Sequence, residues 1–215
     1  QNQKEHNLIQ FVGHEQQRSK MFLKFELIEP RNRFITDLQS LELGQVIEYM
    51  RELLKALKYL HQECAIIHRD IKPDNFVHHF ASGTFRLIDF GSAQYSSNVK
   101  KAGGGTRGFR APERLHQTKK KDTAAVDVWS AGIILLSLLT GNANILTHKA
   151  KESGKTCDER HLHEIGSIVG RKEMSVLIEN CTDYGDGYKY ETKTGWAAKA
   201  LHSVHKQRAW KPDDK

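Results

Sequence analysis

Two short apolar runs open the chain, NLIQFVG (residues 7–13) and MFLKFELI (residues 21–28), and the polar stretch HEQQRSK (residues 14–20) separates them. Runs of this length, bounded by polar residues, are typical of β-strands. The pattern therefore predicts two strands over residues 7–13 and 21–28, joined by a turn over residues 14–20.

A helical period follows over residues 44–62. Apolar side chains recur there at intervals of three and four residues, which places them on one face of a helix. The pattern predicts an amphipathic helix with that face on a core and its charged face in solvent. The predicted apolar face consists of Val46, Met50, Leu53, Leu54, Leu57 and Leu60, and the residues expected to point outward are Glu52, Lys55 and Lys58.

The second half of the chain predicts a hairpin and further helices. The runs FVHHF (residues 76–80) and FRLIDF (residues 85–90), joined by ASGT, are typical of a small β-hairpin. A loop rich in Gly and Ser leads to a helix over residues 126–139, which is apolar on nearly every face and is therefore expected to be buried. Short helices are predicted over residues 161–170 and 172–180, and an exposed loop over residues 182–195.

Composition narrows the class of protein only slightly. The 215 residues are 38% hydrophobic and 27% charged, which is ordinary for a soluble globular protein. The net charge of +7 suits acidic partners, but a mildly basic surface is commoner than a basic binding site. The cysteines are far apart and odd in number, the N-terminus lacks a signal-peptide pattern, and no apolar stretch is long enough to span a bilayer. We therefore expect a soluble intracellular protein without a disulfide framework.

Four short motifs follow one another between residues 68 and 132. HRDIKPDN (residues 68–75) places an aspartate, a lysine and an asparagine on one tight loop, and IDFG (residues 88–91) ends the second run of the predicted hairpin. GGGTRGFRAPE (residues 103–113) and DVWSAG (residues 127–132) come next. Each motif is weak alone, but four in this order at compatible spacings are hard to produce by chance.

On these motifs the chain resembles the eukaryotic protein kinases over residues 6–180. The resemblance implies an α+β fold of the protein-kinase type: residues 1–29 would be a remnant of the small lobe with the hinge, and residues 30–215 the mainly helical large lobe, with residues 180–215 poorly matched. The lysine in HRDIKPDN points to the serine/threonine branch. The stretches GFRAPE, EYMRELLKALKYLHQ and IVGRKEM are similar to the cell-division-cycle-7 kinases that fire replication origins. That likeness implies work in the nucleus, an activating regulatory subunit and substrates in the minichromosome-maintenance helicase.

Phosphoryl transfer requires a hydroxyl aimed in line, metal ions on the phosphates and positive charge where negative charge spreads. Asp70 is expected to accept or orient the proton of the substrate hydroxyl, and Lys72 to neutralise the migrating phosphoryl group. Asn75 and Asp89 are the expected ligands of Mg²⁺. The expected cofactors are therefore ATP and Mg²⁺. The residues expected to contact ATP are Glu26, Ile28, Val77 and Asp89.

Other residues are expected to hold the site together. Thr106 would tie the substrate-binding loop to Asp70 and Lys72, and Asp127 would anchor the catalytic loop through its backbone amides. The remaining structural positions of the catalytic loop are His68 and Arg69.

The charges after Thr106 suggest the kind of substrate. Arg107 and Arg110 flank the loop expected to meet the substrate, which predicts a preference for acidic or phosphorylated residues near the acceptor Ser or Thr. Glu113 would pair with an arginine late in the lobe, for which Arg208 is the candidate. No membrane or nucleic-acid partner is expected.

Two expected parts of the ATP site have no counterpart here. The Gly-rich loop and the lysine of the third strand would precede residue 7, and GGGTRG comes after the metal-binding aspartate, so it is not that loop. Lys24 lies directly before the hinge, with no room for the intervening helix and strand. We therefore expect an incomplete kinase that is inactive by itself.

Several alternatives stay open. The chain could be a non-catalytic kinase-like interaction module or a basic nucleic-acid-binding protein, although it has no recognised nucleic-acid motif. The run KKKD (residues 119–122) is interpreted as a solvated loop. Tyr95, Ser96 and Ser97 are candidates for phosphorylation that would engage Arg69, although loop serines are usually just solvated. The residues considered for zinc, whose spacing fits no closed site, are His148, Cys157, His161 and His163.

Overall fold

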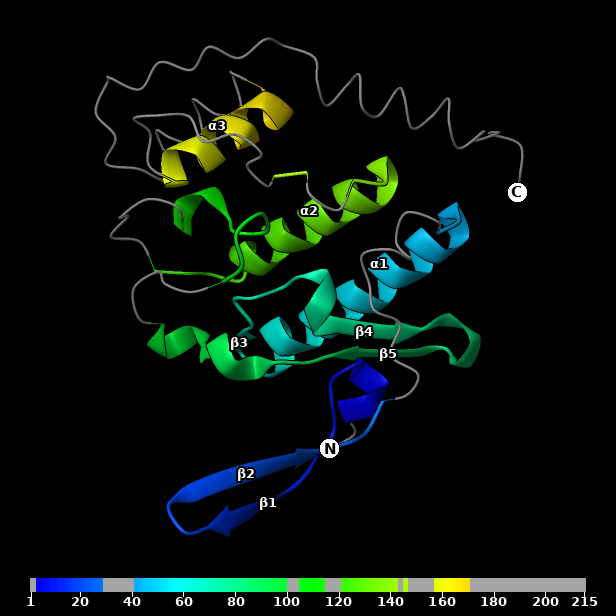
Figure 1. The fold of residues 1–215 in the computed structure, drawn as a ribbon, viewed down its shortest axis with the longest axis vertical. Coiled ribbons are helices and arrows are strands. Elements are labelled where there is room, and N and C mark those ends of the chain that lie inside the picture. Colours follow the sequence, from blue (N-terminus) through cyan, green and yellow to red (C-terminus); the bar gives the residue numbers. More distant parts are fainter. Residues whose placement is uncertain are drawn as a thin grey trace.

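The computed structural model describes residues 3–28, 41–99, 105–114, 121–142, 145–146 and 157–170. Helices α1 (Leu43–Lys58) and α2 (Ala125–Thr140) pack on each other at its centre, and α3 (Cys157–Val169) lies beyond α2 (Figure 1). One β-hairpin packs against α1, and a second projects from the body (Figure 1). The described residues therefore form an α+β structure.

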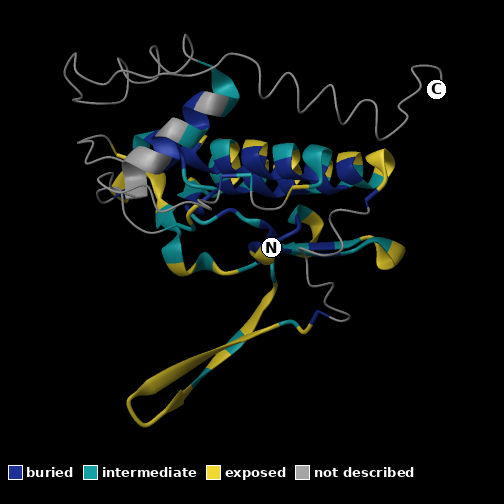
Figure 2. Cartoon of the chain, turned by 45° about the horizontal axis from the view of Figure 1, so that its top comes forward, coloured by how far each residue is buried: buried dark blue, intermediate teal, exposed yellow. Residues whose placement is uncertain are grey.

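The projecting hairpin consists of β1 (Phe11–Gln17) and β2 (Lys20–Phe25), which pair antiparallel from Phe11↔Phe25 to Gln17↔Lys20. The prediction of two strands is confirmed, but the turn predicted over residues 14–20 is wrong. Residues 14–17 continue β1, and the reversal needs only residues 18–19, where Arg18 has φ 54°. The prediction failed because the hairpin is exposed along most of both strands (Figure 2), so polar residues do not end a strand there.

Helix α1 begins with a capping interaction and ends in a π-helical turn over Tyr59–Glu63. The Gln45 side chain accepts a hydrogen bond from the backbone N–H of Glu42 (3.0 Å), which satisfies a donor at the helix start. The predicted apolar face is buried except for Leu54, which is 48% exposed. Tyr49 and Ala56 are buried in its place, so the core-facing stripe is rotated slightly away from Leu54.

The predicted second hairpin is confirmed as β4 (Phe76–His79) and β5 (Thr84–Leu87), with Gly83 at φ 62° in its turn. Its inner face packs on α1, where the ring centroid of Tyr49 lies 5.1 Å from that of Phe76. The chain before β1 adds to the edge of β5, because the Leu87 N–H donates to Asn7 O (2.7 Å) and the Ile9 N–H donates to Leu87 O (3.0 Å). The hairpin thereby joins the N-terminal segment to the helical body.

Two very short strands frame the predicted catalytic loop. β3 (Ile66–Ile67) precedes residues 68–75 and pairs antiparallel with β6 (Gln94–Tyr95). β4 begins directly after the loop, and Asp89 follows β5 by two residues. The loop and Asp89 are therefore held at the same end of paired strands.

Helix α2 confirms the helix predicted over residues 126–139, but it is not buried on every face: Val128 is 54% exposed and Leu135 is 36% exposed. Its buried side packs on α1, and Ile133 packs with Leu162 and Ile165 of α3. The helix predicted over residues 161–170 lies largely within α3, and the predicted segments 172–180 and 182–195 lie outside the described residues. None of the helices within the described ranges has the length and apolar character needed to cross a bilayer.

Candidate active site

The catalytic loop is fixed by a carboxylate from the first turn of α2. Asp127 is fully buried; its Oδ2 accepts from the backbone N–H of His68 (2.8 Å) and its Oδ1 accepts from that of Arg69 (2.8 Å). The Nε2 atom of His61 lies 2.8 Å from the same Oδ2. Backbone donors that face a buried carboxylate are satisfied by strong, charge-assisted hydrogen bonds. The loop therefore has a rigid backbone just before Asp70.

His68 connects this loop to the segment that carries Asp89. Its Nε2 lies 3.0 Å from Ile88 O, and its Nδ1 accepts from the Asp70 N–H (3.3 Å). Both contacts are satisfied by a neutral ring with its proton on Nε2. Burial lowers the pKa of His68 from its usual value, even though nearby carboxylates, Asp127 first among them, favour the charged form.

Asp70, Lys72 and Thr106 form one polar group. Asp70 Oδ1 accepts from both the Thr106 backbone N–H and the Thr106 hydroxyl (each 2.8 Å), and Lys72 Nζ donates to that hydroxyl oxygen (2.8 Å). Lys72 Nζ also lies 3.1 Å from Asp70 Oδ2. Burial opposes the ionisation of Asp70, but the hydrogen bonds from Thr106 and Lys72 outweigh it and lower the pKa of this carboxyl. Asp70 is therefore a carboxylate near neutral pH.

The two expected metal ligands are each positioned by hydrogen bonds to neighbouring residues. The Asn75 amide nitrogen donates to Asp70 O (2.8 Å), which leaves the amide oxygen as the atom suited to a metal ion. The backbone oxygen of Asn75 accepts from the Ile88 N–H (2.8 Å), one residue before Asp89. Asp89 itself has φ 60° and accepts from the Gly91 N–H (3.2 Å).

The described residues contain no cluster of three or more His, Cys, Asp or Glu side chains arranged around a metal position. Asn75 and Asp89 offer side-chain oxygen atoms, which suit Mg²⁺ because this ion is usually bound by one or two carboxylates together with substrate phosphates and water. The zinc alternative gains no support, although His148 and the side chains of Cys157 and His163 lie outside the described part of the chain.

A pocket of about 1070 Å³ lies between the projecting hairpin and the body. All four residues expected to contact ATP line it, although they come from separate segments of the chain. Its walls are mainly apolar, and they include the acidic residues Asp74 and Asp89. Small-molecule pockets usually have volumes of ~300–1,000 Å³, so this pocket is at the large end of that range. Its size and apolar lining suit a ligand that has a flat base and a charged tail. The residues that line it from these segments are Glu26, Ile28, Val77 and Asp89, with Leu8, Ile9, Leu23, Leu60 and Ile88 among the apolar ones.

The Glu26 side chain is already occupied by contacts within the chain. Its carboxylate lies 2.8 Å from Arg86 Nε and 3.3 Å from Lys4 Nζ, and it accepts from the Gln10 N–H (3.0 Å). Burial opposes the negative charge, but these contacts outweigh it and lower the pKa of Glu26. The carboxylate therefore fixes the strand end before Ile28, and any ligand contact of Glu26 would come from its backbone. Lys24 pairs with Glu15 across the hairpin (2.6 Å).

The segment after Thr106 carries the arginines expected to meet the substrate. Arg107 is exposed, whereas Arg110 is half-buried and donates to Gly105 O (2.7 Å). Glu113 is half-buried in the 3-10 turn Pro112–Arg114, and its candidate partner Arg208 lies outside the described residues. Arg107 is therefore the better placed of the two arginines to contact a substrate, since Arg110 also supports its own loop.

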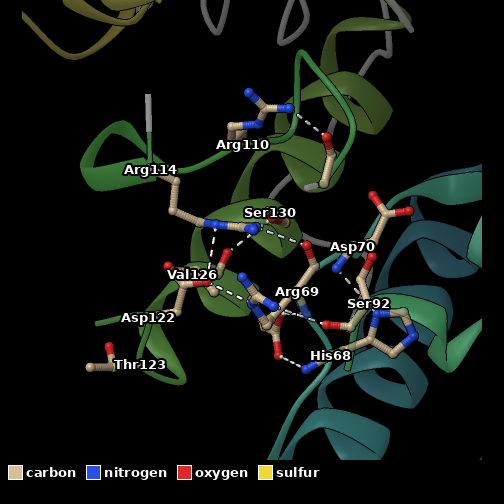
Figure 3. A network of polar contacts seen from close by, with 12 residues as sticks. His68, Arg69, Asp70, Ser92, Arg110, Arg114, Asp122, Thr123, Val126 and Ser130 are labelled. Carbon is tan, nitrogen blue, oxygen red and sulfur yellow. Dashed lines mark hydrogen bonds and ion pairs between the residues drawn. The ribbon is translucent and has the colours of Figure 1, made fainter. Parts of the chain in front are cut away.

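A charge cluster behind Asp70 was missed by the sequence analysis. Asp122 Oδ2 lies 2.7 Å from Arg69 Nε and 3.2 Å from Arg114 Nε (Figure 3). Asp122 is 4% exposed, so the interpretation of KKKD as a solvated loop is wrong for this residue. Lys121 is exposed, and residues 119–120 lie outside the described residues. The sequence offered no signal, because an aspartate after three lysines looks like any surface charge. Asp74 in the pocket was also missed, although its place inside HRDIKPDN was a hint.

Comparisons with known proteins agree with this geometry. The protein kinase domain model matches residues 1–203. Two Encephalitozoon cuniculi proteins, named probable cell division control protein 7 homologs 1 and 2, are each 34% identical over 206 residues, which cover 78% of this chain. The CBL-interacting serine/threonine-protein kinase 9 of Arabidopsis thaliana is 32% identical over 142 residues, 63% of this chain and 31% of its own length. The chain spans 55% of the length of the two Encephalitozoon proteins. Because the family model covers most of the chain, and because the motif residues Asp70, Lys72 and Thr106 contact one another, the chain belongs to the protein kinase family.

Proposed function

We propose that this chain forms the greater part of the catalytic domain of a serine/threonine kinase, which transfers the γ-phosphate of ATP to protein hydroxyls. The observation that carries the proposal is the group of Asp70, Lys72 and Thr106, joined by contacts of 2.8–3.1 Å. It combines an ionised carboxylate with a cation that can face a phosphoryl group. An interaction module has no need of such a group.

The roles of the chain's own residues follow from their contacts. Thr106 makes two hydrogen bonds of 2.8 Å to Oδ1 of Asp70, whereas the contacts of Oδ2 with Lys72 Nζ (3.1 Å) and Asn75 Nδ2 (3.3 Å) are longer. Oδ2 is therefore the oxygen better placed to orient a substrate hydroxyl and take up its proton. Lys72 sits between Asp70 and Thr106 and supplies positive charge where negative charge develops. His68 and Asp127 hold the loop backbone and do not take part in the chemistry.

ATP with Mg²⁺ would supply the phosphoryl group and neutralise its oxygens when bound. Asn75 and Asp89 would hold the metal through their side-chain oxygens. The base of ATP would bind in the apolar pocket, in contact with the backbone of residues 26–28 and the side chain of Val77.

The direct test is phosphorylation by the protein produced from its complete coding sequence. We expect the wild type to transfer phosphate from ATP to Ser or Thr peptides in the presence of Mg²⁺. Asp89→Asn should lose both this transfer and the Mg²⁺-dependent binding of ATP. Glu15→Gln removes a half-exposed carboxylate of β1 and its surface contact with Lys24; it is the matched control and should behave as the wild type. A wild type that folds well but neither binds ATP nor transfers phosphate would favour the interaction-module alternative.

We further propose that the substrates carry acidic or phosphorylated residues next to the acceptor. Arg107 is exposed beside Thr106, and its positive charge favours such neighbours. Peptide pairs that differ only by Asp against Asn beside the acceptor serine test this. The Asp peptide should have the lower KM with the wild type, and Arg107→Gln should remove the difference. An equal KM for both peptides with the wild type would contradict the preference.

The printed names of the Encephalitozoon relatives support a role in cell division. We propose a kinase of the replication-origin type that works in the nucleus with an activating regulatory subunit. A tagged copy expressed from its own gene should concentrate in the nucleus, and a stoichiometric protein that raises its kcat should copurify. A fully active lone chain outside the nucleus would refute this assignment and leave the kinase proposal intact.

A further inference from the structure

Three buried charges meet directly behind the catalytic aspartate. Arg69, Arg114 and Asp122 are 6%, 9% and 4% exposed, and one carboxylate oxygen of Asp122 faces the Nε atoms of both arginines at 2.7 and 3.2 Å (Figure 3). Asp122 comes from the chain just before α2, Arg69 from the catalytic loop and Arg114 from the turn after Phe109. The cluster therefore joins three separate segments.

The cluster depends on its single carboxylate. Two guanidinium groups buried together repel each other, and burial lowers the pKa of Arg114 while Asp122 opposes that change. Arginine is better suited than lysine to burial in such a site, because its planar guanidinium group can donate to several acceptors at once. Removal of the negative charge would leave two buried cations close together, which is strongly unfavourable.

The same residues support the backbone on which the proposed chemistry depends. Arg69 has φ 72°, an uncommon value for a residue with a side chain, and it directly precedes Asp70. Its N–H donates to Asp127, its carbonyl oxygen accepts from Arg114 Nη1 (2.8 Å), and its own Nη1 donates to Ser92 O (3.3 Å). The backbone conformation that presents Asp70 is thus held partly through Arg114.

The segment that carries Thr106 is packed against the same point. Gly105 has φ 79°, and a Cβ atom on it would lie 2.9 Å from both Arg69 O and Arg114 Nη1. The next residue, Thr106, makes the two hydrogen bonds to Asp70. Loss of the arginine positions would therefore disturb Asp70 and Thr106 together.

We propose that Asp122 is a positioning residue, which acts through Arg69 and Arg114 to hold Asp70 and Thr106 in contact without a phosphate on residues 95–97. The proposal rests on the kinase function proposed above. Kinase activation loops are often ordered by a phosphate that pairs with arginine. Here the Arg69 guanidinium already contacts a carboxylate inside the protein, whereas Tyr95, Ser96 and Ser97 are exposed. A phosphate on any of them would have to displace a buried carboxylate to reach Arg69.

The experiment compares the wild type, Asp122→Asn, Asp122→Glu and the control Glu15→Gln, all produced from the complete coding sequence and treated with phosphatase. Absence of phosphate is verified by mass spectrometry. Two readouts are taken: kcat with the KM for ATP, and hydrogen exchange at the Thr106 amide, which reports its bond to Asp70 without any need for catalysis.

We expect the phosphatase-treated wild type to keep at least half of its kcat. Asp122→Asn should lose about tenfold or more in kcat with a small change in the KM for ATP, since one charge-assisted contact is removed from the positioning of the catalytic group. The Thr106 amide should exchange at least about tenfold faster in this variant, and Asp122→Glu should recover part of both effects. A role in stability alone would instead raise exchange throughout the fold and would leave kcat per folded molecule unchanged.

Two results would overturn the proposal: a large loss of kcat when the wild type is dephosphorylated, or unchanged Thr106 exchange in Asp122→Asn. If Asp122→Asn does not fold, the dephosphorylated wild type alone decides, through its kcat. If the wild type transfers no phosphate in either state, the kinase function fails, and Thr106 exchange still tests the positioning role separately.

Discussion

Asp70 and Thr106, 36 residues apart in the sequence, are joined by two hydrogen bonds to the same carboxylate oxygen, one from the Thr106 backbone and one from its hydroxyl, each 2.8 Å long. The backbone bond requires only that the segment lies in place. The hydroxyl bond requires the side chain and also offers an acceptor to Lys72 at 2.8 Å. The two contributions can therefore be separated by mutation.

Thr106→Val removes the hydroxyl and keeps the shape and the backbone N–H. We expect kcat to fall by about tenfold or more, because a hydrogen bond to a charged group contributes about 1.5–3 kcal/mol and each 1.4 kcal/mol is a factor of ten. The KM for ATP should change little, since Thr106 does not line the pocket. Steady-state kinetics check this, with Thr106→Ser as the control that retains the hydroxyl. Equal losses in both variants would show that the hydroxyl is not the cause.

Asp70→Asn keeps the size of the side chain and removes its charge. We expect phosphoryl transfer to fall by about 10²–10⁴-fold or more, because the amide does not take up a proton. The melting temperature should stay within a few degrees of the wild type, since Asp70 is half-buried and its backbone contacts remain. Initial rates and thermal unfolding on the same samples provide the measurement. Unchanged turnover would refute the catalytic assignment.

Gly105→Ala and Gly83→Ala differ in what the added methyl group meets. Both positions have positive φ, 79° and 62°, so each substitution carries a backbone cost of about 1–2 kcal/mol. Only at Gly105 does the Cβ lie within 2.9 Å of backbone and side-chain atoms, whereas at Gly83 nothing lies within 4 Å. We expect Gly105→Ala to lower the free energy of unfolding by about 1–3 kcal/mol more than Gly83→Ala does. Urea unfolding of the two variants measures it; equal losses would contradict the close packing at Gly105.

His68 should make stability depend on pH. Its folded-state pKa is lowered from 6.5 mainly by burial, so the unfolded chain binds a proton that the folded chain does not. Above about pH 6.5 His68 is neutral in both states, so it costs no stability there. The free energy of unfolding should decrease as the pH falls from about 6.5 toward the folded-state pKa.

Unfolding by urea at a series of pH values, in the wild type and in His68→Gln, isolates this effect. The wild type should lose more stability than the variant as the pH falls below about 6.5. His14→Gln removes an exposed histidine of β1 and serves as the control. Parallel pH curves for the wild type and His68→Gln would show that His68 is not the cause.

The local elements and the residues of the site could be predicted from local sequence patterns. Helical periodicity identified α1, a stretch that is apolar on nearly every face identified α2, and short apolar runs identified both hairpins, because these patterns reflect neighbours a few residues apart. The motifs named Asp70, Lys72, Asn75 and Asp89 as one chemical set. The comparisons support the family assignment made from those motifs.

Which charges are buried, and which residues they contact, depends on the packing of distant segments. Asp122 and Arg69 are 53 residues apart, and nothing near either residue distinguishes their buried pair from surface charges. Leu54 belongs to an apolar stripe by its spacing, yet it is exposed because the neighbours of α1 cover a face rotated away from it. Local sequence determines periodicity and chemistry, whereas burial and long-range pairing depend on how separate segments pack together.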